Sequence, residues 1–144
     1  MQSRTVASIK YIDASQLFNM MKRGSSTPFQ VIDVRGSDYI GGHIRGGWNY
    51  PYKKFSDSIP ELLDRLQEKR SSNSNDTTIN VVFHCAQSQQ RGPSAAMKFL
   101  REIPEPDLDK FEISVLRGGF INWQDLYGSD STVTEDYHPD LWSW

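Results

Sequence analysis

Three short runs of apolar residues alternate along the chain with segments in which apolar residues recur at helical spacing. The runs cover residues 29–35, 79–83 and 111–116, and each predicts a β-strand. The first run is too apolar to be half exposed, so we expect it to lie in the interior of a parallel sheet. The glycine-rich stretch 41–48 predicts a loop with one short strand, and the polar stretch 71–78 predicts a surface loop.

Four segments have the pattern of helices. A capping box formed by Asp13 and Gln16 marks the start of the first helix. Pro60 marks the start of the second, which we expect to extend to residue 69. The other two predicted helices cover residues 93–101 and a segment through residues 123–126.

Strands that alternate with helices predict an α/β domain built on a mostly parallel sheet. A chain of 144 residues has the length of one domain, so we expect residues 1–144 to form a single unit. The last segment, residues 128–144, contains four acidic residues and two tryptophans. We expect it to be a solvated acidic tail anchored by Trp142 or Trp144.

The charge of the chain argues against two classes of partner. A net charge of −2 at pH 7 gives no sign of a basic face that would bind nucleic acid or an anionic membrane surface. No apolar run approaches the length of a membrane span. We therefore expect a protein that binds neither nucleic acid nor membrane. A monomer is the default expectation, because nothing in the sequence indicates an oligomer.

The single cysteine of the chain, Cys85, follows the second apolar run almost directly. One cysteine excludes an internal disulfide, and a nucleophilic thiol needs a reducing compartment, so we expect a cytoplasmic or nuclear location. Five residues separate Cys85 from Arg91, and the predicted helix 93–101 follows. A strand, a short loop and a helix start form a cradle for an anion, because the loop N–H groups and the helix dipole point into it.

The residue types around Cys85 predict a nucleophile at the floor of an oxyanion site. Such a cradle favours the thiolate, and the planar guanidinium of Arg91 suits two oxygens of a phosphate-like anion. We expect His84 to order the loop and Gly92 to let the chain turn into the helix. The Ser88 hydroxyl either contacts the departing thiolate or caps a backbone group. The loop N–H groups that would bind the anion belong to Ala86, Gln87, Ser88, Gln89, Gln90 and Arg91.

A purely structural cysteine is the alternative, since a lone cysteine after an apolar run is usually a small buried core residue. The context favours catalysis, because Pro93 suits the first turn of a helix directly after the loop. Three widely spaced histidines and one cysteine do not form a zinc site, and the glycine pairs lack the spacing of a dinucleotide loop. We expect no metal and no cofactor.

Four motifs, taken in order, resemble the rhodanese-homology superfamily over nearly the whole chain. They are residues 31–35, 42–47, 84–93 and 116–123. Within the superfamily, the third motif is similar to that of the M-phase inducer dual-specificity phosphatases and the small fungal arsenate reductases. The resemblance implies a rhodanese-like domain with a mostly parallel five-stranded sheet flanked by helices.

The resemblance also assigns roles outside the cysteine loop. It implies that Asp33 and Arg35 are scaffold residues that hydrogen-bond neighbouring loops, and that His43 bonds the backbone of its glycine-rich turn. The M-phase inducer phosphatases have a glutamate directly before the arginine, where this chain has Gln90. The loop therefore contains no acid that could protonate a leaving oxygen.

Loop length distinguishes between the chemistries of the superfamily. Sulfur-transferring rhodaneses usually have a loop one residue shorter, so the resemblance favours phosphate or arsenate over sulfur. We expect a tyrosine or dual-specificity protein phosphatase that forms a phosphocysteine and acts on a phosphoprotein or small oxyanion. The main alternative is an arsenate reductase whose adduct is resolved by external glutathione or glutaredoxin. A sulfurtransferase and a non-catalytic module that binds phosphoproteins are further alternatives.

Overall fold

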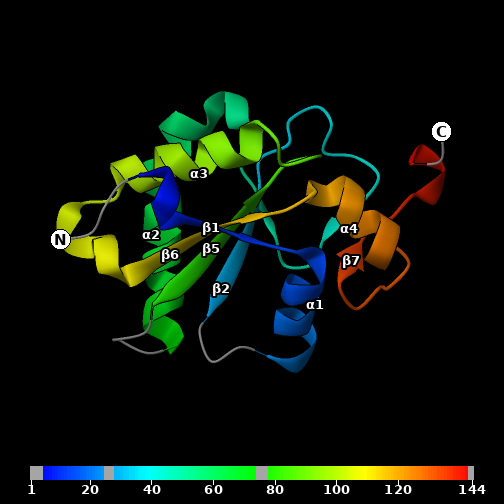
Figure 1. The fold of residues 1–144 in the computed structure, drawn as a ribbon, viewed down its shortest axis with the longest axis horizontal. Helices are drawn as coiled ribbons and strands as arrows, with labels where there is room; N and C mark the ends of the chain where they lie inside the picture. The colour runs from blue at the N-terminus through cyan, green and yellow to red at the C-terminus, as the bar shows by residue number, and fades with distance from the viewer. Residues whose placement is uncertain (1–4, 25–27, 74–77, 143–144) are drawn as a thin grey trace.

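A five-stranded parallel sheet in the order β1-β6-β5-β2-β4 forms the centre of the molecule (Figure 1). The computed structural model describes residues 5–24, 28–73 and 78–142. The predicted α/β fold with a five-stranded parallel sheet is confirmed. The strands are β1 (Ile9–Ile12), β2 (Phe29–Asp33), β4 (Trp48–Asn49), β5 (Ile79–His84) and β6 (Phe111–Leu116).

Helices cover both faces of this sheet (Figure 1). The helices α2 (Phe55–Asn73) and α3 (Arg91–Glu102) pack on one face, and α1 (Ala14–Arg23) and α4 (Gly119–Tyr127) pack on the other. Successive residues of β5 alternate between the two cores, as the period of a strand requires. Short 3-10 helices are η1 (Val6–Ser8), η2 (Tyr52–Lys54), η3 (Glu105–Lys110) and η4 (Pro139–Leu141).

The predicted capping box at the start of α1 is confirmed. The Asp13 carboxylate accepts a hydrogen bond from the Gln16 backbone N–H at 2.9 Å, and the Gln16 side chain accepts one from the Asp13 N–H at 2.8 Å. Leu17 on the inward face is fully buried. Because both ends of the box are satisfied, the helix begins where the sequence predicts.

The predicted start of α2 at Pro60 is wrong, because the helix begins five residues earlier at Phe55. Phe55 and Ile59 are 0% and 2% exposed, so the additional turn carries two core side chains. Their burial offsets the backbone hydrogen bond that a proline inside a helix cannot donate. The helix also extends to Asn73, so the first part of the predicted loop 71–78 is helical, and residues 74–77 lie outside the described residues.

The glycine-rich stretch 41–48 contributes to two short strands instead of the predicted one. They are β3 (His43–Ile44) and the central-sheet strand β4, and β3 pairs antiparallel with β7 (Thr134–Glu135). The first apolar run forms a strand only as far as Asp33. The edge strand β1 has no counterpart among the predicted elements, because it is only four residues long and its two middle residues, Lys10 and Tyr11, are exposed, so it forms no apolar run.

The prediction of a solvated tail is wrong for the segment around β7. Val133 and Thr134 are buried, since they pack between β3 and α4. Further along, the Trp142 ring packs on Phe120, and its indole N–H donates to the Gly41 carbonyl at 2.9 Å. Trp142 therefore anchors this segment, while Trp144 lies outside the described residues.

The register of the sheet brings the carboxyl ends of three strands together. Asp33 at the end of β2 lies opposite His84 at the end of β5, and Phe83 lies opposite Val115 of β6. In an open parallel sheet, ligands bind beyond this edge. Cys85 is the first residue beyond β5, so the fold places the single cysteine there.

Replacement of Gly119 by alanine tests how closely α4 must approach this edge. Gly119 has a φ of +60°, and a β-carbon there would lie within 2.6 Å of the Cys85 carbonyl oxygen. We expect Gly119→Ala to lower the free energy of unfolding by about 2 kcal/mol in chemical denaturation. Gly36→Ala is the control, because a β-carbon at Gly36 meets nothing within 4 Å. Equal stability of the two variants would contradict the close approach.

Candidate active site

Cys85 lies at the start of a tight loop and is only 3% exposed. Its sulfur accepts a hydrogen bond from the Ser88 backbone N–H at 3.1 Å, so one loop amide already points at the predicted nucleophile. The Ser88 hydroxyl accepts from the Cys85 N–H at 3.3 Å, which is the backbone-capping alternative for this side chain. Ser88 takes a φ of +57°, and this left-handed residue makes the reversal of the loop possible.

The first turn of α4 binds the backbone of the cysteine loop through two hydrogen bonds. The Cys85 carbonyl accepts from the Phe120 N–H at 3.0 Å, and the Ala86 carbonyl accepts from the Ile121 N–H at 2.9 Å. Both peptide units are trans, so their N–H groups, on Ala86 and Gln87, point away from α4. These two carbonyl contacts therefore direct loop amides toward the side on which an anion would bind.

The other wall of the cradle is the start of α3. Gln90 is its N-cap and makes no side-chain capping bond, so the positive end of this helix stays turned to the loop. A β-carbon at Gly92 would lie 3.4 Å from the His84 Cα, which shows how closely α3 approaches the end of β5. Gly92 is already inside the helix without a positive φ, so its contribution is this close approach and not a turn.

The remaining loop side chains are neutral, and most of them are exposed. Ala86 is half-buried, whereas Gln87, Gln89 and Gln90 lie at the surface. None of these side chains carries a carboxylate or a cation. Charge at the site must therefore come from elements outside the loop.

A buried ionic network lies beneath the loop. The Asp33 carboxylate accepts hydrogen bonds from the Arg35 guanidinium, the shortest at 2.7 Å, and the same guanidinium donates to the Gly42 carbonyl at 2.8 Å. Burial alone would raise the pKa of Asp33, but His84 and Arg35 together hold it below its ordinary value. The scaffold role implied for Asp33 and Arg35 agrees with these contacts.

His84 connects this network to the cysteine. The ring is fully buried, with Nδ1 3.1 Å from the Cys85 carbonyl oxygen and Nε2 3.7 Å from Oδ2 of Asp33. Burial lowers the pKa of His84, although the neighbouring Asp33 carboxylate opposes this shift. The side chain points away from the anion side of the loop and contacts its backbone.

Arg91 makes a contact that the sequence analysis missed. Its Nη1 and Nη2 donate to Oδ1 and Oδ2 of Asp38 at 2.9 and 2.6 Å. The hydrogen bonds from Arg91 lower the pKa of Asp38 to about 2, and the Asp38 carboxylate raises the pKa of Arg91. The position of Asp38 in the sequence is the signal that could have identified it. Asp38 follows β2, the strand beside β5, and so lies at the same edge of the sheet as the cysteine loop.

His43 does not bond the backbone of its turn as the resemblance implies. Its Nε2 lies 3.3 Å from a carboxylate oxygen of Glu135, and its ring stacks on Tyr39. These contacts join β3 to β7, so His43 belongs to the connection between the glycine-rich stretch and the C-terminal segment.

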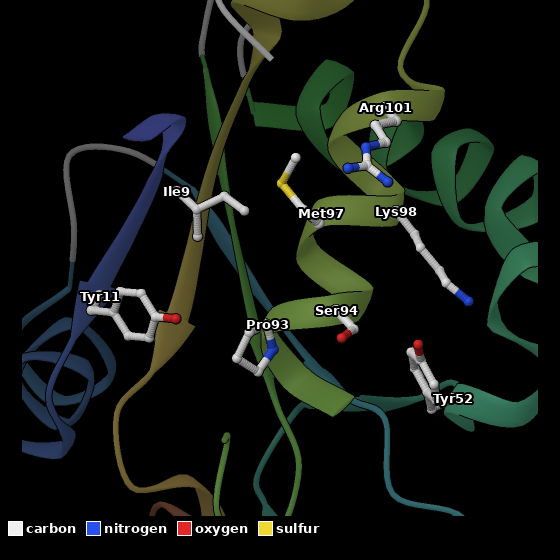
Figure 2. A pocket seen from close by; sticks show the side chains of 8 residues that line it. All are labelled: Ile9, Tyr11, Tyr52, Pro93, Ser94, Met97, Lys98 and Arg101. Atoms are coloured by element: carbon white, nitrogen blue, oxygen red, sulfur yellow. The ribbon is translucent and has the colours of Figure 1, made fainter. Parts of the chain in front are cut away.

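A cavity of about 400 Å³ lies along α3 and begins at its first turn, at Pro93 and Ser94. Figure 2 shows Pro93 and Met97 projecting from α3 toward Ile9 and Tyr11 of β1, and Arg101 also lines the cavity. On the other side of α3, the Lys98 ammonium lies over the Tyr52 ring at 4.6 Å. The lining of the cavity is partly apolar and contains two cations, Lys98 and Arg101.

Two features are absent from the described residues, a cluster that could hold a metal ion and a helix that could cross a membrane. Within residues 5–24, 28–73 and 78–142, no cluster of three or more histidine, cysteine or acidic side chains could hold a metal ion. In the same part of the chain, no helix combines the length and the apolar character needed to cross a bilayer.

Comparisons with known proteins agree with this geometry. A family model of the rhodanese-like domain matches residues 13–126. The chain is 47% identical to CDC25-like phosphatase YCH1 of Saccharomyces cerevisiae over 99% of each protein. It is 32% identical to arsenical-resistance protein 2 of the same yeast, over 81% of this chain and 88% of that protein.

A solved structure gives the same result at the level of the backbone. The yeast protein Ygr203w, described as a protein tyrosine phosphatase of the Rhodanese family, matches with a TM-score of 0.83 and 47% identity. The match covers 94% of this chain and 98% of that one. The sheet, the cysteine loop and these matches together show that the chain belongs to the family of rhodanese-like domains, among relatives named as phosphatases and arsenate reductases.

Proposed function

We propose that the protein is a cysteine-dependent phosphatase of the tyrosine or dual-specificity type. The observation that carries this proposal is the loop between Cys85 and Arg91, whose first two carbonyls bind α4. The N–H groups of Ala86 and Gln87 and the start of α3 remain available for the equatorial oxygens of a phosphoryl group. Relatives named as phosphatases, one of them 47% identical, support the same chemistry.

In the first step the Cys85 thiolate attacks phosphorus in line with the ester oxygen. An S–P bond forms, the P–O ester bond breaks, and the leaving oxygen departs with the electron pair of that bond and takes a proton from solvent water. The loop amides and the Arg91 guanidinium bind the three other oxygens, where negative charge develops. The Ser88 N–H, at 3.1 Å from the sulfur in the free protein, stabilises the thiolate before the attack.

In the second step a water molecule attacks the phosphocysteine. A new P–O bond forms as the S–P bond breaks, and the water gives up a proton to solvent. The Cys85 thiolate is regenerated and inorganic phosphate is released. The same amides stabilise the charge in this step. The reaction requires no redox change and no second cysteine in the chain.

The neutral loop bears on the choice of substrate. Gln90 stands where the M-phase inducer phosphatases have an acid, and the other loop side chains supply none. Without a general acid, a phenolate leaves more readily than an alkoxide, because the phenolate is the weaker base. The proposal therefore favours phosphotyrosine and other aryl phosphates over phosphoserine and phosphothreonine.

Replacement of Cys85 by serine tests the nucleophile. We expect Cys85→Ser to lower kcat on an aryl phosphate by about a thousandfold or more, while phosphate binding measured by calorimetry persists. Arg91→Lys keeps the charge but loses the planar fork, and we expect a loss of about a hundredfold. Activity of Cys85→Ser within tenfold of the parent would overturn the mechanism.

Replacement of Gln90 by glutamate tests the missing acid. A carboxylate at this N-cap is compatible with the helix dipole, so the variant should fold. We expect Gln90→Glu to raise kcat/KM on alkyl phosphates by about tenfold more than on aryl phosphates. Gln87→Glu adds the same charge at another exposed position of the loop and serves as the control. Equal effects on both substrate classes would contradict the explanation.

Arsenate reduction is a second candidate function, and two observations favour it. A relative named arsenical-resistance protein 2 is 32% identical, and the neutral loop hinders this reaction less because the leaving group is water or hydroxide. Cys85 would form an S–As bond with arsenate and expel that group. A glutathione thiolate would then attack the Cys85 sulfur, the S–As bond would break and arsenic would leave as As(III) with the electron pair of that bond. The mixed disulfide between Cys85 and glutathione would be reduced by a second external thiol, such as glutaredoxin or glutathione.

A side-by-side assay distinguishes the two functions. We expect purified protein to release phosphate from an aryl phosphate faster than it reduces arsenate in the presence of glutathione and glutaredoxin. Cys85→Ser provides the blank for both reactions. Arsenate reduction with negligible phosphate release would replace the phosphatase proposal by the reductase.

A further inference from the structure

The guanidinium that the proposed mechanism assigns to the oxyanion already binds a carboxylate. Arg91 donates from two nitrogens to the two oxygens of Asp38, at 2.9 and 2.6 Å. The two parallel N–H donors of this contact are the ones that a guanidinium offers to two oxygens of phosphate or arsenate. Asp38 therefore uses the donors that an oxyanion would need.

The turn that carries Asp38 is fixed from the interior of the protein. Oδ1 of Asp38 also accepts the Gly36 backbone N–H at 3.0 Å, and the Tyr39 N–H closes the turn on the Gly36 carbonyl at 2.9 Å. Nη1 of the buried Arg35 donates to the carbonyls of Asp38 and Ile40 at 3.5 and 3.4 Å. The carboxylate is thus held toward Arg91 by the same network that lies beneath the cysteine loop.

The Asp38 carboxylate and a bound phosphate or arsenate differ in charge, so the two anions bind Arg91 with different strength. Asp38 offers Arg91 one negative charge, whereas a phosphate monoester or arsenate at neutral pH offers up to two. A bound dianion also leaves the Asp38 carboxylate without its partner and close to another negative group. The side chains of Arg91 and Asp38 are 34% and 41% exposed, so water moderates both effects without removing them.

We propose that Asp38 competes with the oxyanion for Arg91, so that binding and release are exchanges of one anion for another on a single guanidinium. This inference rests on the proposed function, since it takes Arg91 as an oxyanion ligand. Asp38 is then a specificity-determining residue. It weakens binding of singly charged anions, which offer Arg91 no more charge than Asp38 does, and it recaptures the guanidinium when the product leaves.

Removal of the carboxylate tests the competition directly. We expect Asp38→Asn and Asp38→Ala to bind inorganic tungstate, a tetrahedral dianion that is not turned over, about tenfold more tightly than the parent. Isothermal titration calorimetry at fixed ionic strength measures the Kd. Asp125→Asn is the matched control, because it removes the same charge from an exposed position on α4 and should leave the Kd unchanged.

Each other outcome overturns the inference in a different way. Affinity unchanged within twofold, as in Asp125→Asn, would show that Asp38 and tungstate do not share Arg91. Weaker binding in both Asp38 variants would show that Asp38 instead holds Arg91 ready for the anion. If the parent and all variants fail to bind tungstate, the proposed function fails, and the competition fails with it.

A second measurement uses the unmodified protein and does not depend on how the variants fold. The carboxyl carbon of Asp38 reports its own titration by NMR. In the free protein its pKa is about 2, because Arg91 donates to it. With saturating sulfate, a tetrahedral dianion that stays monomeric in acid, where tungstate polymerises, we expect the midpoint to rise into the ordinary range for aspartate, near 4, because the guanidinium has been taken. An unchanged midpoint would contradict the exchange.

Discussion

The buried ion pair between Asp33 and Arg35 is the interaction on which the rest of the site depends. The side chains of Asp33 and Arg35 are 3% and 0% exposed, so water cannot solvate the charge that remains when its partner is removed. Loss of one partner from such a pair typically costs about 3–5 kcal/mol. The Arg35 guanidinium also lies 4.4 Å from the centre of the Phe120 ring and donates to the Gly42 carbonyl, so one side chain fixes α4 and the glycine-rich stretch together.

Three sets of contacts connect the pair of Asp33 and Arg35 to the anion site and fix the geometry of that site. Phe120, packed against Arg35, donates its backbone N–H to the Cys85 carbonyl, and His84 lies between Asp33 and the same carbonyl. Arg35 also holds the turn that presents Asp38. The cysteine loop contributes a thiol and amides, while the orientation of those amides comes from residues distant in the sequence. A neutral loop can therefore form a charged site.

The sequence predicts best the features that depend on neighbouring residues. The capping box of Asp13, the run that forms β6 and the strand, loop and helix around Cys85 all contain their own signals. The early start of α2 was missed because the burial of Phe55 compensates for Pro60, and β7 was missed because its partner β3 lies far along the chain. The pair of Asp38 and Arg91, 53 residues apart, is invisible to local patterns and needs the strand order to be found.

The strand order also has a consequence for the order in which the chain can fold. β1 is the first strand of the chain but pairs with β6, so that Ile9 lies beside Ile113. Pairing between such distant segments is slow, because the entropy cost of closing a long loop must be met before any contact between the strands can offset it. During synthesis β1 remains without this neighbour until β6 emerges, and α4, which fixes the cysteine loop, emerges later still. The cradle around Cys85 is therefore among the last parts of the protein to take shape.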